Sequence, residues 1–159
     1  MNTWGIDTYK EGISRHYSFT KKDLHKLQVL QNQVSRLLIN RGPLHECYLS
    51  TAELLKLSGD LSVHQLGAVS TICLMKRVLM SGKPSYLAEL IQNTISRGTR
   101  SGNTIKQYKI RLEVVREGFL YRGIQLFNRI SDDLKMEDSM VKFKRNVKKW
   151  VEANIAVKP

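Results

Sequence analysis

Apolar residues recur every three or four positions through much of the chain, which is the spacing of one face of an α-helix. After residue 20 this spacing predicts a helix with one apolar face, made of Leu24, Leu27, Leu30, Val34, Leu37 and Leu38. Thr20 and Asp23 have the spacing of a capping box at its start. Gly42 and Pro43 predict its end, because glycine accepts a left-handed cap and proline cannot continue a helix.

Similar signals predict the other helices. Capping boxes that begin at Ser50 and Ser62 open two helices, which stop near Gly59 and Gly82. The second of these helices is apolar nearly all round, so we expect it at the centre of the core. More helices are predicted at residues 86–91, 117–129 and 139–154.

These elements predict a mainly α fold, a helical bundle of about five to six helices in one domain, because 159 residues is the length of one domain. At most one short strand or hairpin is expected, near 107–115, where apolar and basic residues alternate. We expect a loosely ordered N-terminal segment at residues 1–19 and an apolar helical core at residues 20–92. A basic flexible loop at residues 93–104 then leads to a strand and basic C-terminal helices at residues 105–159, which pack on the same core.

The charge of the chain is unusual. It carries 26 Lys and Arg residues against 14 Asp and Glu residues, a net charge of +12. Such an excess is typical of proteins that meet RNA, DNA or an anionic membrane surface, although a protein can be basic without such a partner. Residues 97–159 hold 15 of the basic and 7 of the acidic side chains, so we expect the contact surface there.

The last predicted helix concentrates the basic charge. Its apolar positions form one face for the core, and five cations occupy the rest of its surface. Two arginines lie in the basic loop. We predict that all seven contact nucleic-acid phosphates without base specificity: Arg97, Arg100, Lys142, Lys144, Arg145, Lys148 and Lys149. The simpler alternative is a helix and a loop whose cations are only solvated.

No residues have the spacing of a catalytic or metal site. Asp132 and Asp133 lack a third carboxylate, so we interpret them as acids at a helix N-terminus, where they complement the helix dipole. The four histidines form no paired spacing, and the sequence has neither a phosphate loop nor a nucleophile elbow. We therefore expect no catalytic residue, metal or cofactor. A small metal-dependent nuclease is the least favoured function.

The cysteines and the hydropathy indicate an intracellular protein. Cys47 and Cys73 lie far apart and outside any metal-binding pattern, which fits a reducing compartment. Residues 1–20 lack the apolar run of a secretory signal, and the most apolar stretch, residues 66–80, is too short to span a bilayer. We expect a soluble protein of the nucleus or cytoplasm with no membrane partner.

Several short motifs follow one another in the first part of the chain. Residues 27–32 read LQVLQN and, with Arg36, fit the pattern LQ-x-x-QN…R. A WG pair stands upstream at residues 4–5. Residues 61–66, LSVHQL, fit LSV-x-QL, and residues 82–87, GKPSYL, fit G-x-P-x-YL.

The second part of the chain continues the series. A TR pair at residues 99–100 precedes YRGIQLFN at residues 121–128, which is similar to F-x-x-RG-x-x-LWN-x-LP. Residues 143–144 and 148–150 resemble a closing FK…LK-x-W. In this order the motifs resemble the C-terminal region of reverse transcriptases from non-LTR (LINE-type) retrotransposons. The resemblance covers residues 4–155.

The chain also departs from that family's pattern. Phe127 replaces the usual tryptophan, and Ile130-Ser131 replaces Leu-Pro, which predicts a looser turn after Asn128. The family's polymerase palm, with its aromatic-x-Asp-Asp metal motif, lies upstream of this region and is not found here. Asp132-Asp133 falls in the tail of the RG cassette and does not match that motif.

The resemblance implies a non-catalytic C-terminal module of an RNA-directed DNA polymerase. In the family this region is thought to help hold the template RNA or the target DNA, and its protein partners would be the upstream polymerase domains. The alternative is a protein-interaction module whose apolar helices pack on those domains or on a second copy. The sequence leaves open the choice between RNA and DNA, and the oligomeric state.

Overall fold

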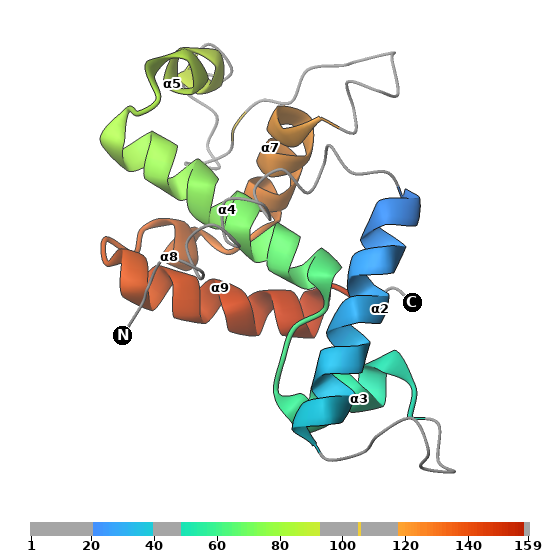
Figure 1. Ribbon diagram of the computed structural model, residues 1–159. Helices are drawn as coiled ribbons and strands as arrows, with labels where there is room; N and C mark the ends of the chain where they lie inside the picture. Colours follow the sequence, from blue (N-terminus) through green and yellow to red (C-terminus); the bar gives the residue numbers. More distant parts are fainter. Residues whose placement is uncertain (1–20, 40–48, 93–104, 106–117, 158–159) are drawn as a thin grey trace, which may run out of the picture.

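The structure, a computed structural model, describes residues 21–39, 49–92, 105 and 118–157. These residues form seven helices and no strand, so the prediction of a mainly α bundle is confirmed (Figure 1). The helices are α2 (Lys21–Leu38), α3 (Thr51–Ser58), α4 (Val63–Ser81), α5 (Ser85–Gln92), α7 (Phe119–Arg129), α8 (Asp132–Lys135) and α9 (Met140–Asn154). The strand predicted near 107–115, and the segments 1–19 and 93–104, lie outside the described residues.

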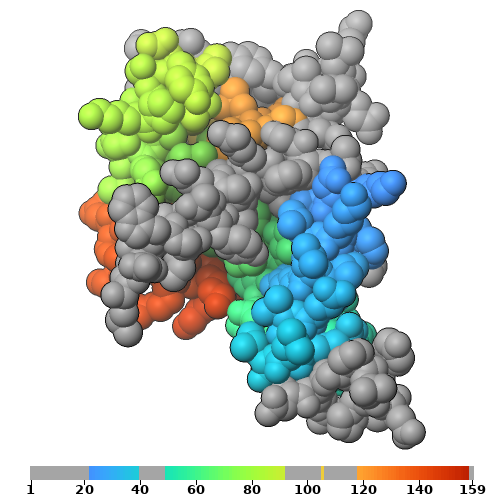
Figure 2. All heavy atoms as spheres, in the orientation of Figure 1, coloured from blue at the N-terminus to red at the C-terminus, as the bar shows by residue number. Residues whose placement is uncertain are grey.

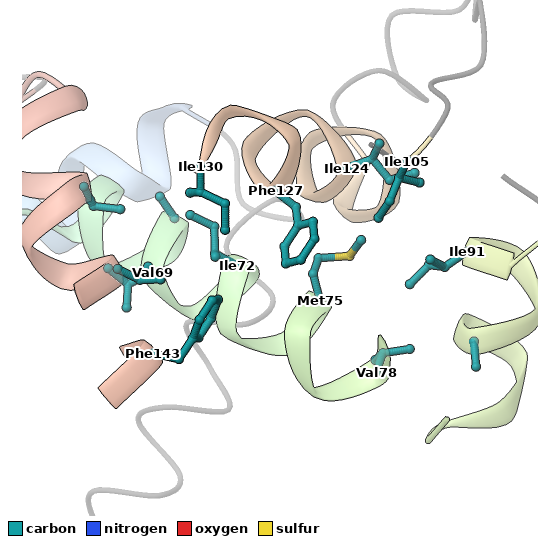
Figure 3. Close-up of a cluster of buried hydrophobic side chains, with 14 of the residues drawn as sticks. Val69, Ile72, Met75, Val78, Ile91, Ile105, Ile124, Phe127, Ile130 and Phe143 are labelled. Atoms are coloured by element: carbon teal, nitrogen blue, oxygen red, sulfur yellow. The ribbon is translucent and has the colours of Figure 1, made fainter. Parts of the chain in front are cut away.

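Helix α4 lies at the centre of the bundle, as its apolar sequence predicts. It packs against α9 and α7, with α5 near its C-terminal end and α2 beside its N-terminal end (Figure 1). Buried side chains from α4, α7 and α9 form one continuous core (Figure 3), which includes Ile72, Met75, Val78, Ile124, Phe127 and Phe143. No helix in the described part of the chain is long and apolar enough to cross a lipid bilayer.

The beginnings of α3 and α4 confirm the predicted capping boxes. In α4, Ser62 Oγ accepts a hydrogen bond from Gln65 N at 3.2 Å, and Gln65 Oε1 accepts one from Ser62 N at 3.0 Å. Ser50 and Glu53 pair in the same way at the start of α3. Both helices end at a glycine in the left-handed conformation, which that residue adopts without steric cost.

Gly123 allows α7 to approach α4 closely. A Cβ atom at this position would lie 3.1 Å from Met75 Sδ and 3.4 Å from Thr71 Cγ2. Atoms in good contact are about 3.5–4.0 Å apart, so a side chain at this position would require that of Met75 to shift by a few tenths of an ångström. The close crossing lets Ile124 and Phe127 of α7 reach the core.

Helix α2 packs with its polar side rather than with its apolar face. Gln28 and Ser35 are buried, with 6% and 1% of their surface exposed, whereas Leu30 and Val34 are 57% and 55% exposed. The polar side meets α3 and the start of α4. The apolar spacing therefore predicted the helix correctly, but it did not predict which side of the helix meets the rest of the bundle.

Candidate nucleic-acid interface

Helix α9 carries most of the predicted site residues, and its packing fixes the direction in which they point. Phe143, Val147 and Val151 are spaced four residues apart and are fully buried, on a helix that packs against α4. Just beyond the end of the helix, the carbonyl of Ile155 accepts a hydrogen bond from Gln65 Nε2 of α4 at 2.7 Å. The apolar face is thus held along its length, and the opposite surface faces away from the bundle.

All five predicted cations of α9 are exposed, and we call them the α9 arc: Lys142, Lys144, Arg145, Lys148 and Lys149. At about 100° per residue they span roughly 160° of the helix surface opposite the core. Two i, i+4 pairs, Lys144 with Lys148 and Arg145 with Lys149, give two rows of charge along the helix. The helix contains no acidic residue before Glu152. The α9 arc therefore presents positive charge without an acidic side chain up to Lys149, and Glu152 lies one turn further on the same side.

Arg77 of α4 extends the positive charge beyond α9. It is exposed, and its charge and that of Lys144 both act on the Cys73 thiol. Burial raises the pKa of this thiol to about 11, and the Lys144 and Arg77 cations oppose the rise. Sequence reasoning did not single out Arg77, because its relation to the α9 arc depends on how two helices cross.

The neighbouring Lys76 belongs to the core and not to this surface. It is buried, and its Nζ donates to the Lys135 carbonyl at 2.6 Å and lies 5.7 Å from the centre of the Phe143 ring. A cation over an aromatic face is attracted by the quadrupole of the ring. Lys76 therefore connects α4 to α8 and α9, and its charge is not accessible to a ligand.

The adjacent acids open the short helix α8, where acidic side chains complement the helix dipole as predicted. Asp132 Oδ1 accepts a hydrogen bond from Lys135 Nζ at 2.8 Å, and Asp133 is exposed. The sequence placed the two acids at a helix N-terminus but gave no bounds for α8, because four residues are too few to show a helical period. Among the described residues, no group of three or more His, Cys, Asp or Glu side chains could hold a metal ion.

Of the seven predicted phosphate contacts, the structure describes the five on α9 and brings them together. Arg97 and Arg100 lie outside the described residues, so their position relative to the α9 arc stays a prediction.

The residues of the LQ-x-x-QN motif have a structural role in α2. Gln28 Oε1 accepts a hydrogen bond from Val63 N at the start of α4, at 3.0 Å. Its Nε2 donates to Gln31 Oε1 at 3.1 Å and to Asn32 Oδ1 at 3.0 Å. Gln31 and Asn32 donate in turn to the chain just before α4 and to the first residue of α3, at 2.7 and 2.8 Å. We call Gln28, Gln31 and Asn32 the polar clamp.

The asparagine of the RG-x-x-LWN motif also bonds to the backbone. Asn128 Nδ2 donates to the Ile105 carbonyl at 2.7 Å, and its Oδ1 accepts from Ile105 N at 3.0 Å. This side chain therefore holds residue 105 against α7, where Ile105 is buried in the core.

No protein-family model, curated protein or solved structure matches the chain. The resemblance to retrotransposon reverse transcriptases thus depends on the order of the motifs alone. The polar clamp and Asn128 give part of that pattern a physical reason, because these amides join separate elements of the bundle.

Proposed function

We propose that this chain is a non-catalytic module that binds the backbone of RNA or DNA. The observation that supports this function is the α9 arc, five exposed cations on a helix whose one acidic residue, Glu152, lies in its last turn. Because the opposite face of the helix is buried, the cations are displayed together on a rigid support. A row of phosphates can contact several of them at once.

The expected binding is electrostatic and independent of sequence. Each cation that neutralises a phosphate releases condensed counterions, and the logarithm of the affinity falls by about 0.9 per phosphate for each unit of log salt on duplex DNA. Five contacts from the α9 arc would give a slope of roughly −4.5. Lysine and arginine on phosphate oxygens read no bases, so the affinity should vary little between sequences.

The same proposal extends to the origin of the chain. The ordered motifs between residues 4 and 155 support a C-terminal region of a non-LTR retrotransposon reverse transcriptase, without the polymerase palm. In such a parent protein the module would help hold the template RNA or the target DNA. Its protein partners would be the upstream polymerase domains.

A second candidate function is protein interaction. The exposed aliphatic side chains of α2 favour it, because a helix in a monomer usually turns its apolar face toward the core. Such a face could pack on the polymerase domains or on a second copy of the chain.

Fluorescence anisotropy with labelled structured RNA and duplex DNA, measured across a salt series, tests the leading function. We expect binding that weakens linearly with log salt. Replacement of all five residues of the α9 arc by glutamine should weaken binding and flatten the slope. Replacing Arg77 as well should flatten it further.

A matched control variant distinguishes the effect of losing the α9 arc from the effect of lowering the net charge. Five other exposed cations are replaced by glutamine in the control variant: Lys22, Lys26, Lys56, Lys83 and Arg129. It loses the same charge, so it should keep most of the slope if the α9 arc is the contact. Equal losses in both variants would show that only the net charge matters, and no binding at low salt would refute the proposed function.

A further inference from the structure

The cations of the α9 arc form two rows, and the strip of helix surface between the rows is not basic. The first row is Lys144 and Lys148, and the second row is Lys142, Arg145 and Lys149. At about 100° per residue, the two rows lie roughly 110° apart around the helix axis. Val141 and Glu152 lie midway between the rows, near opposite ends of α9, and we call these two residues the midline.

Neither midline residue suits a contact with phosphate. Val141 is aliphatic and 81% exposed, and Glu152 is exposed and acidic. A single phosphate strand laid along the centre of the arc would meet an apolar side chain at one end and a like charge at the other. Phosphates that follow the two rows pass to either side of both residues. The pattern of side chains therefore favours two phosphate strands, one on each side of the helix.

The position of α9 in the molecule leaves room for two strands. The helix lies along one margin of the bundle, below α4 in Figure 1, and its red-orange atoms form part of the lower margin in the space-filling view (Figure 2). The helices that pack most closely against it, α4 and α8, lie on its other side. Arg77 of α4 adds to the first row, because its charge and that of Lys144 both act on the Cys73 thiol.

We propose that α9 lies in the major groove of duplex DNA, with its two rows of cations on the phosphates of opposite strands. This inference rests on the proposed function and names the polymer and the groove. An α-helix with its side chains is about 10–12 Å across, and the major groove of B-form DNA is about 12 Å wide. The groove therefore admits the exposed side of α9 and brings a phosphate strand to each row.

Other nucleic acids fit this surface less well. The major groove of duplex RNA is deep and narrow, and its minor groove is wide and shallow, so only one row of cations could follow a strand there. Sites for single strands usually stack bases on aromatic side chains. No aromatic residue is among the exposed residues of α9, since Phe143 is buried and Trp150 is half-buried.

The floor of the groove offers partners to both midline residues. An aliphatic side chain can contact the methyl group of thymine, and a carboxylate can accept a hydrogen bond from the amino group of cytosine. Val141 and Glu152 are separated by about 16 Å along the helix, or about five base pairs. The cations still contact phosphates alone, so a preference for sequence is confined to these two positions.

Salt titrations with three polymers of the same sequence test the choice of polymer. On duplex DNA both rows make contacts, and the slope of log affinity against log salt should be roughly −4.5. On duplex RNA the two or three contacts of one row should give roughly −1.8 to −2.7, with weaker binding. Equal slopes on the two duplexes, or tighter binding to single-stranded DNA, would overturn the major-groove placement. No binding to any polymer would refute the proposed function itself, so the two failures are distinguishable.

Methylation by dimethyl sulfate tests the choice of groove. This reagent attacks guanine N7, which faces the major groove, and adenine N3, which faces the minor groove. In a short DNA duplex saturated with the chain, methylation of guanine N7 should fall and that of adenine N3 should not. Protection of adenine N3 alone, or of neither atom in a fully bound duplex, would place α9 outside the major groove.

Two variants that each add one lysine test the arrangement of the rows. Ala153 is exposed and lies four residues after Lys149, so Ala153→Lys extends the second row and should steepen the salt slope by about 0.9. Val141→Lys adds the same charge on the midline, above the base edges, and should steepen the slope less. An equal or larger effect of Val141→Lys would mean that phosphates follow the midline, and the two-strand arrangement would be wrong.

Discussion

The polar clamp should contribute measurably to the stability of the whole bundle, and replacing Gln28 by alanine tests this directly. Gln28 is 6% exposed and forms three hydrogen bonds, one of them with the backbone amide of Val63. The substitution leaves that buried amide without its acceptor, which costs about 1–3 kcal/mol, and removes two bonds worth about 0.5–1.5 kcal/mol each. We therefore expect a loss of about 2–6 kcal/mol, a large part of the 5–15 kcal/mol typical of a domain.

Urea unfolding, followed by circular dichroism and by tryptophan fluorescence, measures this loss. Gln33→Ala is the matched control, because Gln33 lies on the same helix and is exposed. An exposed substitution of this kind should change the free energy of unfolding by less than about 0.5 kcal/mol. If Gln28→Ala is no more destabilising than this control, the clamp does not hold α2 to α4 and our reasoning about its orientation fails.

Three further predictions concern other parts of the bundle. Gly123→Val should lower the free energy of unfolding by about 1–3 kcal/mol in urea melts, because it overpacks the crossing with Met75, and a neutral effect would contradict that close contact. Cys73 should react with iodoacetamide slowly at pH 8 until the chain is unfolded, since burial raises its pKa to about 11. Stability should fall as the pH rises from 9.0 toward 11, where only the unfolded thiol ionises, and Cys73→Ala should remove this dependence. Hydrogen bonds from the Ser50 side chain and backbone lower the pKa of Glu53 in the folded chain. The ionised carboxylate should therefore add to the free energy of unfolding above pH 4.5, and this stabilisation should be lost as the pH falls through the lowered pKa. Glu53→Gln should flatten that part of the pH profile.

The parts of the fold that depend on local chemistry were predictable from the sequence. The capping boxes at Ser50 and Ser62, and the glycines that end α3 and α4, act within a few residues, so the sequence predicted where both helices begin and end. The four residues of α8 carry too short a pattern to predict the bounds of that helix. The orientation of α2 depends on hydrogen bonds between residues about 30 positions apart, which apolar spacing does not show.

In the candidate site too, the features set by local sequence were predictable and those set by helix packing were not. The helical period places the five cations of α9 on one arc as soon as Phe143 and Val147 are assigned to the core. Arg77 could not be included in this way, because it lies on α4 and joins the surface only through the packing of α4 against α9. Lys76, its neighbour in the sequence, is buried.

The bond between Asn128 and Ile105 has a consequence for how this protein can change in evolution. Asn128 binds both the amide and the carbonyl of residue 105, so one side chain fixes the position of a residue 23 places earlier in the sequence. Both bonds go to main-chain atoms, so they put no demand on the identity of the side chain at position 105. Position 105 can therefore accept other apolar residues that fit the core, whereas a change of Asn128 loses both bonds at once.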